Sequence, residues 1–168
     1  MKIKFELNGQ AIEIETNSDK PLNLILMDDL GLASLNSACK GANCGNCVVL
    51  WNSRSALSCL IPAFRLEGTV VQTFDNFQRT RAYRDIVKAY KDCSVRPCPQ
   101  CYASKTLMIE ALARDLESES SYIIRDDRRR MIEQELSGNT CYCVGVNELA
   151  RVVEKTYSIR RMKIVRTT

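Results

Sequence analysis

The sequence contains the run Cys39-Lys40-Gly41-Ala42-Asn43-Cys44-Gly45-Asn46-Cys47, and a fourth cysteine, Cys59, follows after eleven residues. The first three cysteines are separated by four residues and then two, which is typical of a plant-type 2Fe–2S site. A loop that wraps three ligands around a cluster needs unusual backbone angles, and Gly41 and Gly45 permit them. The alternatives are buried free thiols or a four-thiolate zinc site, but zinc favours paired short spacings. The run therefore predicts a 2Fe–2S cluster held by Cys39, Cys44, Cys47 and Cys59.

Strand patterns surround this cysteine loop. Residues 3–7 alternate between apolar and polar side chains, and Asn8-Gly9 is a strong hairpin signal before the alternation resumes at 12–14. A short helical pattern over 22–30 follows, and further strands are predicted over 47–51, 56–60 and 69–74. This order of elements predicts a small mixed α+β domain over residues 1–77.

After Phe77 the hydrophobic spacing becomes helical. Apolar side chains recur every three or four residues over 83–90, 107–116, 128–136 and 149–157. Four short helices predict a helical bundle over residues 78–157, so the whole chain is expected to be an α+β protein. The last segment, residues 158–168, carries four basic residues and is expected to be a loose basic tail.

A second group of cysteines lies in the helical half, as Cys98-x2-Cys101 and Cys141-x-Cys143. This spacing alone fits an iron–sulfur cluster and a zinc ion about equally. A thioredoxin-like dithiol needs a strand context that is missing here. Cys93 offers another register, because Cys93, Cys98 and Cys101 repeat the spacing of the first loop. We favour the two pairs, because two helix ends can bring them together around one cluster.

The composition excludes several kinds of catalytic site and metal site. The chain has 168 residues, nine cysteines and no histidine, which excludes cysteine–histidine catalysis, Cys2His2 zinc fingers and Rieske centres. An odd number of cysteines argues against a complete set of internal disulfides. The net charge of +4 is too small to indicate nucleic-acid binding. No segment approaches the roughly 18 apolar residues of a membrane span, and the acidic Glu6 interrupts any signal sequence, so we expect a cytoplasmic protein.

Taken together, the two groups resemble the small iron–sulfur subunit of the molybdenum hydroxylases, the family of xanthine dehydrogenase, aldehyde oxidoreductase and aerobic carbon monoxide dehydrogenase. The resemblance covers about residues 1–157 and includes the ordered set of eight cysteines. Its further motifs are Leu7-Asn8-Gly9, Leu30-Gly31-Leu32, Cys44-Gly45-Asn46-Cys47-Val48-Val49-Leu50, Ser58-Cys59-Leu60 and Leu136-Ser137-Gly138-Asn139-Thr140-Cys141-Tyr142-Cys143.

The resemblance implies a β-grasp ferredoxin-like domain with one 2Fe–2S cluster, followed by a four-helix bundle with a second. The ligands of the second cluster would be Cys98, Cys101, Cys141 and Cys143, and Cys143 would lie nearest the pterin. Molybdopterin would belong to a large partner, whereas FAD would belong to a medium one, in a heterotrimer or a dimer of heterotrimers. The chain would then be a non-catalytic electron-transfer subunit of an oxidoreductase, carrying electrons from molybdenum to flavin.

The surroundings of the second group depart from the family pattern. Pro97 stands where the family usually has a pterin-contacting Gln, Pro99 where it has Gly, and Tyr142 where it has Arg. The usual Thr-Pro-Gly after the second ligand is Tyr102-Ala103-Ser104, and Val144-Gly145-Val146 replaces Thr-Gly-Tyr. Pro97 offers neither a side-chain amide nor a backbone N–H, so the resemblance implies an altered pterin contact.

Three basic residues lie near cysteines in the sequence: Lys40 beside Cys39, Arg96 two residues before Cys98, and Lys105 four residues after Cys101. Each is a candidate for offsetting cluster charge and raising a reduction potential, with an ordinary solvated charge as the alternative. Two other functions remain open at this point. One is a free-standing ferredoxin with one working cluster, and the other is a non-redox protein with zinc in the helical site.

Overall fold

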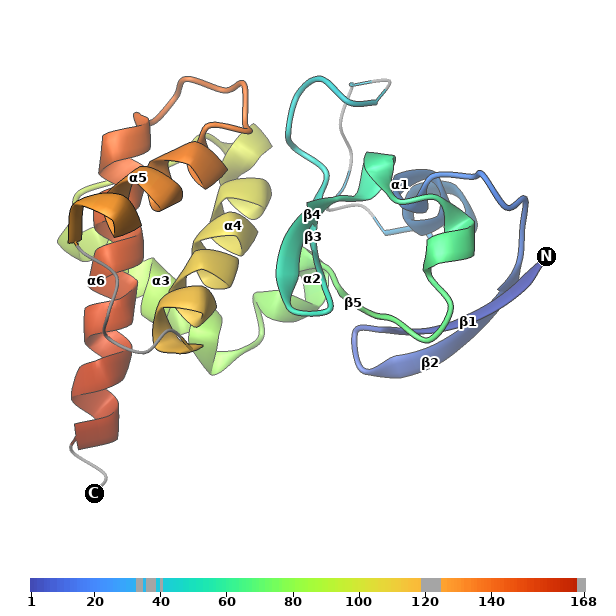
Figure 1. Cartoon of the computed structure of the whole chain (residues 1–168), viewed down its shortest axis with the longest axis horizontal. Helices are drawn as coiled ribbons and strands as arrows, with labels where there is room; N and C mark the ends of the chain where they lie inside the picture. The colour runs from blue at the N-terminus through green and yellow to red at the C-terminus, as the bar shows by residue number, and fades with distance from the viewer. Residues whose placement is uncertain (33–34, 36–38, 40, 119–124, 166–168) are drawn as a thin grey trace.

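The computed structural model describes residues 1–32, 35, 39, 41–118 and 125–165 (Figure 1). Five strands form one sheet: β1 (Lys2–Leu7), β2 (Gln10–Glu15), β3 (Val48–Trp51), β4 (Arg54–Leu57) and β5 (Val70–Gln72). The strand order is β2-β1-β5-β3-β4, and β1 and β5 are parallel whereas the other neighbouring pairs are antiparallel. The Asn8-Gly9 turn joins β1 to β2, as the hairpin signal predicts.

The helices fall into short turns around the sheet and longer helices beside it. The short ones are α1 (Leu22–Leu24), the π-helical turn η1 (Ile25–Asp29), the 3₁₀ turns η3 (Ser58–Leu60) and η4 (Ala63–Arg65), and α2 (Phe74–Phe77). The longer ones are α3 (Arg81–Asp92), α4 (Pro99–Ser118), α5 (Arg125–Leu136) and α6 (Val146–Val165). In Figure 1 these four helices gather on one side of the molecule and the sheet lies on the other. The predicted mixed α+β class is thus confirmed.

Two hydrophobic clusters fill the interior. One lies under the sheet and includes Ile3, Phe5 and Leu7 of β1, which are buried as their alternation predicts. The other lies among the helices. Strand β3 contributes to both, because successive side chains of a strand point to opposite faces. Val49 packs in the sheet cluster, whereas Val48 and Leu50 pack in the helical one. This double burial explains the uninterrupted apolar run Val48-Val49-Leu50.

Two predicted strands end earlier than the sequence pattern indicates. The strand predicted over 56–60 is β4 at Arg54–Leu57, and the chain then turns through η3. Ser58 sets this turn, because both its backbone N–H (2.9 Å) and its hydroxyl (2.7 Å) donate to the carbonyl oxygen of Cys47. The strand predicted over 69–74 ends at Gln72, and Asn8 Oδ1 accepts the N–H of Thr73 just before α2.

The basic segment at residues 158–168 is not a loose arm over the part that the structure describes, because α6 continues to Val165. Ile159 is buried in the helical cluster. Arg160 pairs with Glu110 of α4 at 2.5 Å and with Glu117 at 3.2 Å, and Lys163 pairs with Asp85 of α3. Acids from distant helices therefore hold these basic side chains in place. Among the described helices, none combines the length and the apolar character that crossing a membrane requires.

Candidate metal centres

The first four predicted ligands line one small hollow: Cys39, Cys44, Cys47 and Cys59. Three of them precede β3, and Cys59 comes from η3, which the turn at Ser58 brings back towards the loop. Backbone N–H groups donate to the sulfurs, among them Gly41 to Cys39 at 3.4 Å, Ala42 to Cys59 at 3.3 Å, and Asn46 to Cys44 at 3.4 Å. Such donors stabilise thiolate sulfur, which is the form that binds metal.

The thiols of this first site differ in acidity. Hydrogen bonds from the backbone N–H groups of Gly41, Asn43 and Cys44 lower the pKa of the Cys39 thiol to about 7. Burial raises the pKa of the Cys47 thiol. Cys39 thus readily forms a thiolate, whereas Cys47 loses its proton when a metal ion compensates the buried charge. Lys40, the basic candidate beside this site, lies outside the described residues.

Gly45 and Gly41 serve the loop in different ways. Both have positive φ, +70° at Gly45 and +123° at Gly41, which favours glycine. A Cβ at Gly41 would meet open space, but a Cβ at Gly45 would lie 2.3 Å from the carbonyl oxygen of Gly138 and 2.7 Å from Cα of Asn139. Gly45 is therefore also the point where the first loop packs directly on the loop that follows α5.

The second four predicted ligands, Cys98, Cys101, Cys141 and Cys143, place their sulfurs within 4.8 Å of one another. Cys98 and Cys101 lie at the beginning of α4, and the other two lie in the loop between α5 and α6. The Sγ–Sγ distances are 3.3 Å from Cys98 to Cys101, 3.6 Å from Cys98 to Cys141 and 3.1 Å from Cys101 to Cys143. The N-terminus of a long helix adds a positive end of a dipole, which favours thiolates.

The thiols of the second site also differ in acidity. Burial raises the pKa of Cys143, but hydrogen bonds from the Cys98 N–H and from the neighbouring thiols outweigh it and lower the value to about 6. Hydrogen bonds from Cys101 lower the pKa of Cys98. Burial raises the pKa of Cys101, which is fully enclosed. This set combines an exposed thiol with a lowered pKa, Cys143, and an enclosed thiol with a raised pKa, Cys101.

Lys105 completes the second site from one turn further along α4. The residue is 2% exposed, and its Nζ donates to the carbonyl oxygen of Cys141 at 2.8 Å and to Cys143 Sγ at 3.5 Å. The sequence identified Lys105 only as a neighbour of Cys101, and its helical spacing gives no sign of burial. Arg96, the other basic candidate near this site, is exposed.

The two sites are joined by hydrogen bonds between their loops. The backbone N–H of Thr140 donates to the carbonyl oxygen of Cys44 at 3.2 Å. The Asn139 amide donates to Asn46 Oδ1 at 2.7 Å and to the Gly45 carbonyl at 3.1 Å, and its Oδ1 accepts the N–H of Cys141 at 2.9 Å. Sequence reasoning assigned no role to Asn139 or Thr140. Two signals in the sequence point to them: they stand two residues and one residue before Cys141, and they belong to the family motif at 136–143.

Cys93 does not join the second group. Its Sγ lies 3.8 Å from the carbonyl oxygen of Arg151 on α6, and the four sulfurs that lie within 4.8 Å of one another do not include it. The surface of the second site is formed by Cys143, which is exposed, and by Tyr142, which is 96% exposed. Pro97 is buried beside Cys98.

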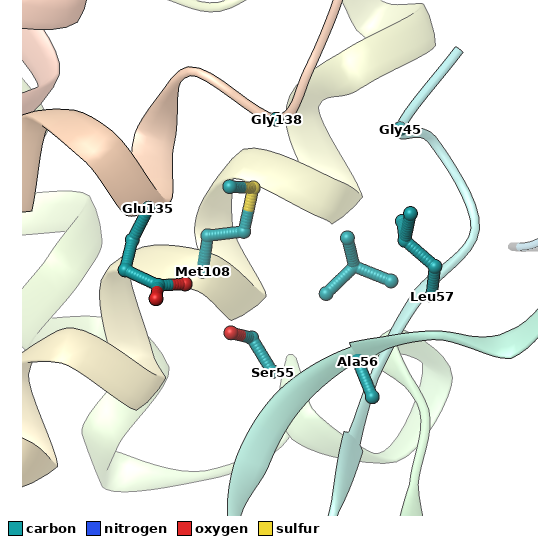
Figure 2. A pocket seen from close by; sticks show the side chains of 8 residues that line it. Gly45, Ser55, Ala56, Leu57, Met108, Glu135 and Gly138 are labelled. Carbon is teal, nitrogen blue, oxygen red and sulfur yellow. The ribbon is translucent and has the colours of Figure 1, made fainter. Parts of the chain in front are cut away.

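A cavity of about 180 Å³ lies between the sheet and the helices, next to the contact between the two loops. Figure 2 shows Met108 of α4 and Glu135 of α5 on one side, and Leu57 and Ala56 of β4 on the other. Gly45 and Gly138 form its upper margin in this view. The lining is mostly apolar, and among the described residues it offers no group of metal ligands.

Comparison with known proteins finds relatives of one kind, although no protein-family model matches the chain. The chain is 30% identical over 159 residues to a nicotinate dehydrogenase subunit of Pseudomonas putida, covering 95% of this chain and 96% of the relative. It is 25% identical over 159 residues to the nicotinate dehydrogenase small FeS subunit of Eubacterium barkeri, with 95% of each covered. A chain of quinoline 2-oxidoreductase from Pseudomonas putida 86 shares the fold, with a TM-score of 0.73 over 96% of both chains at 21% identity.

Proposed function

The chain belongs to the small iron–sulfur subunits of the molybdenum hydroxylases, and we propose that it relays electrons one at a time through two 2Fe–2S clusters. The relay runs from a molybdopterin-binding large subunit to an FAD-binding medium subunit. In this role the chain makes and breaks no substrate bonds, because the substrate chemistry belongs to the large partner.

We assign the ligands of the first cluster to Cys39, Cys44, Cys47 and Cys59, and those of the second to Cys98, Cys101, Cys141 and Cys143. When bound, a 2Fe–2S cluster supplies reversible uptake of a single electron. The residues of the chain contribute the rest. Backbone N–H groups stabilise the sulfurs of the first site, and the buried thiols Cys47 and Cys101 keep water from the inner side of each site.

The observation that carries this proposal is the hydrogen bond from Thr140 to the carbonyl oxygen of Cys44. It links a proposed ligand of the first site to the residue next to Cys141, a proposed ligand of the second. The joined loops hold the two sites together in one fixed arrangement. A relay needs two one-electron sites within short reach of each other, and this contact supports that requirement.

The domain layout that accompanies the relay is also a proposal. Residues 1–77 would form a β-grasp ferredoxin-like domain, residues 78–157 a four-helix bundle, and residues 158–168 a basic tail, whose described part continues the last helix to Val165. The separate hydrophobic clusters support this division.

We infer which surface contacts each partner subunit from the residues at the surface of the two sites. We assign the surface at Cys143 and Tyr142 to the molybdopterin subunit, with Cys143 nearest the pterin, and the surface at the first site to the FAD subunit. Relatives named as subunits of dehydrogenases support a multi-subunit assembly. A heterotrimer or a dimer of heterotrimers in the cytoplasm is the arrangement we propose. The buried Pro97 makes the pterin contact differ from that of a chain with an amide at this position.

Iron and acid-labile sulfide per chain, measured on anaerobically purified protein, test the proposal together with EPR after dithionite reduction. Two clusters require four iron and four sulfide per chain and two distinct S = 1/2 signals. Two iron with a single signal would leave one working cluster and contradict the relay. Cys101→Ser should remove one signal selectively, and Cys93→Ser is the matched control that should leave both.

A zinc-binding structural protein is the second candidate, and the compactness of the second site is the observation that favours it. Four thiolates at about 2.3 Å from one tetrahedral ion lie about 3.8 Å apart. The three Sγ–Sγ distances given above, 3.1–3.6 Å, approach that value. Zinc without sulfide in the purified chain would establish this candidate and exclude electron transfer through the second site.

A further inference from the structure

Lys105 is a buried cation whose described partners carry no carboxylate. Its Nζ reaches the carbonyl oxygen of Cys141 and the sulfur of Cys143. The buried acid on the same helix, Glu110, is occupied by Arg114 and Arg160. Within the described residues, no ion pair that includes Lys105 is present. Lysine is almost never fully enclosed unless a negative charge accompanies it.

The second site is the place where such a negative charge belongs. Four thiolates around an oxidised 2Fe–2S unit give a net charge of roughly −2, and a further electron makes the unit more negative. A cation fixed beside one ligand is attracted more strongly to the reduced unit than to the oxidised one. Low local dielectric strengthens this difference, because Lys105 is enclosed by protein.

We propose that Lys105 is a positioning residue that raises the reduction potential of the second cluster. This inference rests on the proposed function, because it requires a cluster at the second site. The enclosed ammonium makes the second cluster easier to reduce than it would be in a chain that lacks this charge.

The bond to the Cys141 carbonyl fixes where the charge acts. At 2.8 Å it is the shorter of the two contacts, so it anchors Nζ at the loop that carries both Cys141 and Cys143. A side chain of similar length without charge would keep the packing of α4 and lose the electrostatic effect. Lys105→Met is such a change, and Lys88→Met, at an exposed position on α3, is its matched control.

An EPR-monitored redox titration of the full-length, cluster-loaded chain is the test. In Lys105→Met one of the two signals should titrate at a lower potential, with at least a tenfold smaller equilibrium constant for reduction, or about 59 mV for one electron. The other signal and both signals of Lys88→Met should stay unchanged. Unchanged potentials in a Lys105→Met chain that holds four iron would overturn the inference and leave the proposed relay intact. Absence of iron from the wild-type chain would instead overturn the relay itself.

A second measurement covers the case in which Lys105→Met fails to hold the second cluster. Wild-type chain labelled with ¹⁵N only at lysine Nζ is reduced and examined by pulsed EPR. A lysine ¹⁵N coupling to one of the two cluster signals is the expected result. No coupling from lysine nitrogen to either signal would contradict the contact between Nζ and the second site, and with it the inference.

Discussion

Gly45 is the residue at which the two cysteine sites touch. Two features disfavour a side chain at Gly45: its φ of +70°, and the 2.3 Å distance from an added Cβ to the Gly138 carbonyl oxygen. Only the short distance reflects the contact between the two sites. Gly31 has a similar φ of +66° with nothing near its missing Cβ. The two glycines therefore separate the effect of backbone angle from the effect of close approach.

We expect Gly45→Ala to destabilise the full chain by about 1–3 kcal/mol more than Gly31→Ala, because a Cβ at Gly45 forces two backbones apart. Urea unfolding of the two variants measures the difference in free energy of unfolding. Equal losses in both variants would mean that the two loops separate without cost.

At the scale of single residues, the sequence predicted which cysteines lie together, but it did not predict the residues around them. Cysteine spacing is a local property, so the loop around Cys44 could be interpreted directly. The burial of Lys105 depends on where α4 packs, and the link through Asn139 joins residues 93 positions apart. Neither is visible in local spacing.

Among the elements, α6 depends on charges that are enclosed by its neighbours. Arg160 pairs with Glu110, whose side chain is 1% exposed, and its Nε lies 3.9 Å from Asp85 of α3. Although burial lowers the pKa of Arg160, the charge of Glu110 outweighs this effect and raises the pKa. One arginine thus holds α3, α4 and α6 together.

Replacing Arg160 with Met should destabilise the chain by about 3 kcal/mol, because Arg114 is then the remaining cation paired with the buried Glu110 among the described residues. The neighbouring Arg161 is exposed, so Arg161→Met is the control and should change stability by less than about 0.5 kcal/mol. Thermal unfolding of the two variants checks this. The double variant Glu110→Met, Arg160→Met should recover part of the loss, and failure to do so would show that the pair acts through packing alone.

The element boundaries show why local patterns were insufficient here. The period of two over 3–7 predicted β1 correctly, because one face of that strand is buried. The end of β4 is set by two hydrogen bonds from Ser58 to Cys47, eleven residues away. The last turns of α6 are held by acids on α3 and α4 that lie far away in the sequence, so the run of basic residues alone predicted a loose tail.

At the scale of the whole molecule, β3 is the strand that packs against both halves. Val48 and Leu50 face the helical cluster while Val49 faces the sheet cluster. In Figure 1, α4 is the long helix on the sheet side of the helical half. Separating the halves would expose the outer face of β3 to water.

We therefore expect residues 1–80, produced alone, to self-associate or bind a hydrophobic dye. In this fragment Val48 and Leu50 would be exposed to water, and each would lose about 2 kcal/mol of the stabilisation that burial gives it. Val48→Thr with Leu50→Thr in the same fragment should reduce both effects. Size-exclusion chromatography and dye fluorescence measure them. A monomeric, dye-free fragment would show that the sheet half is complete without the helices.

The shared contact at Gly45, Asn139 and Thr140 also has a consequence for how chains are filled in the cell. Under the proposed relay, a cluster in the first site would hold the loop before Cys141, so the second cluster would be inserted into a loop that is already ordered. Chains made under iron limitation should then divide into full and empty populations, with fewer half-filled chains than independent sites would give. Native mass spectrometry counts these populations directly. Scarcity of iron would then lower the number of fully loaded chains, and few chains would carry a single cluster that cannot pass electrons on.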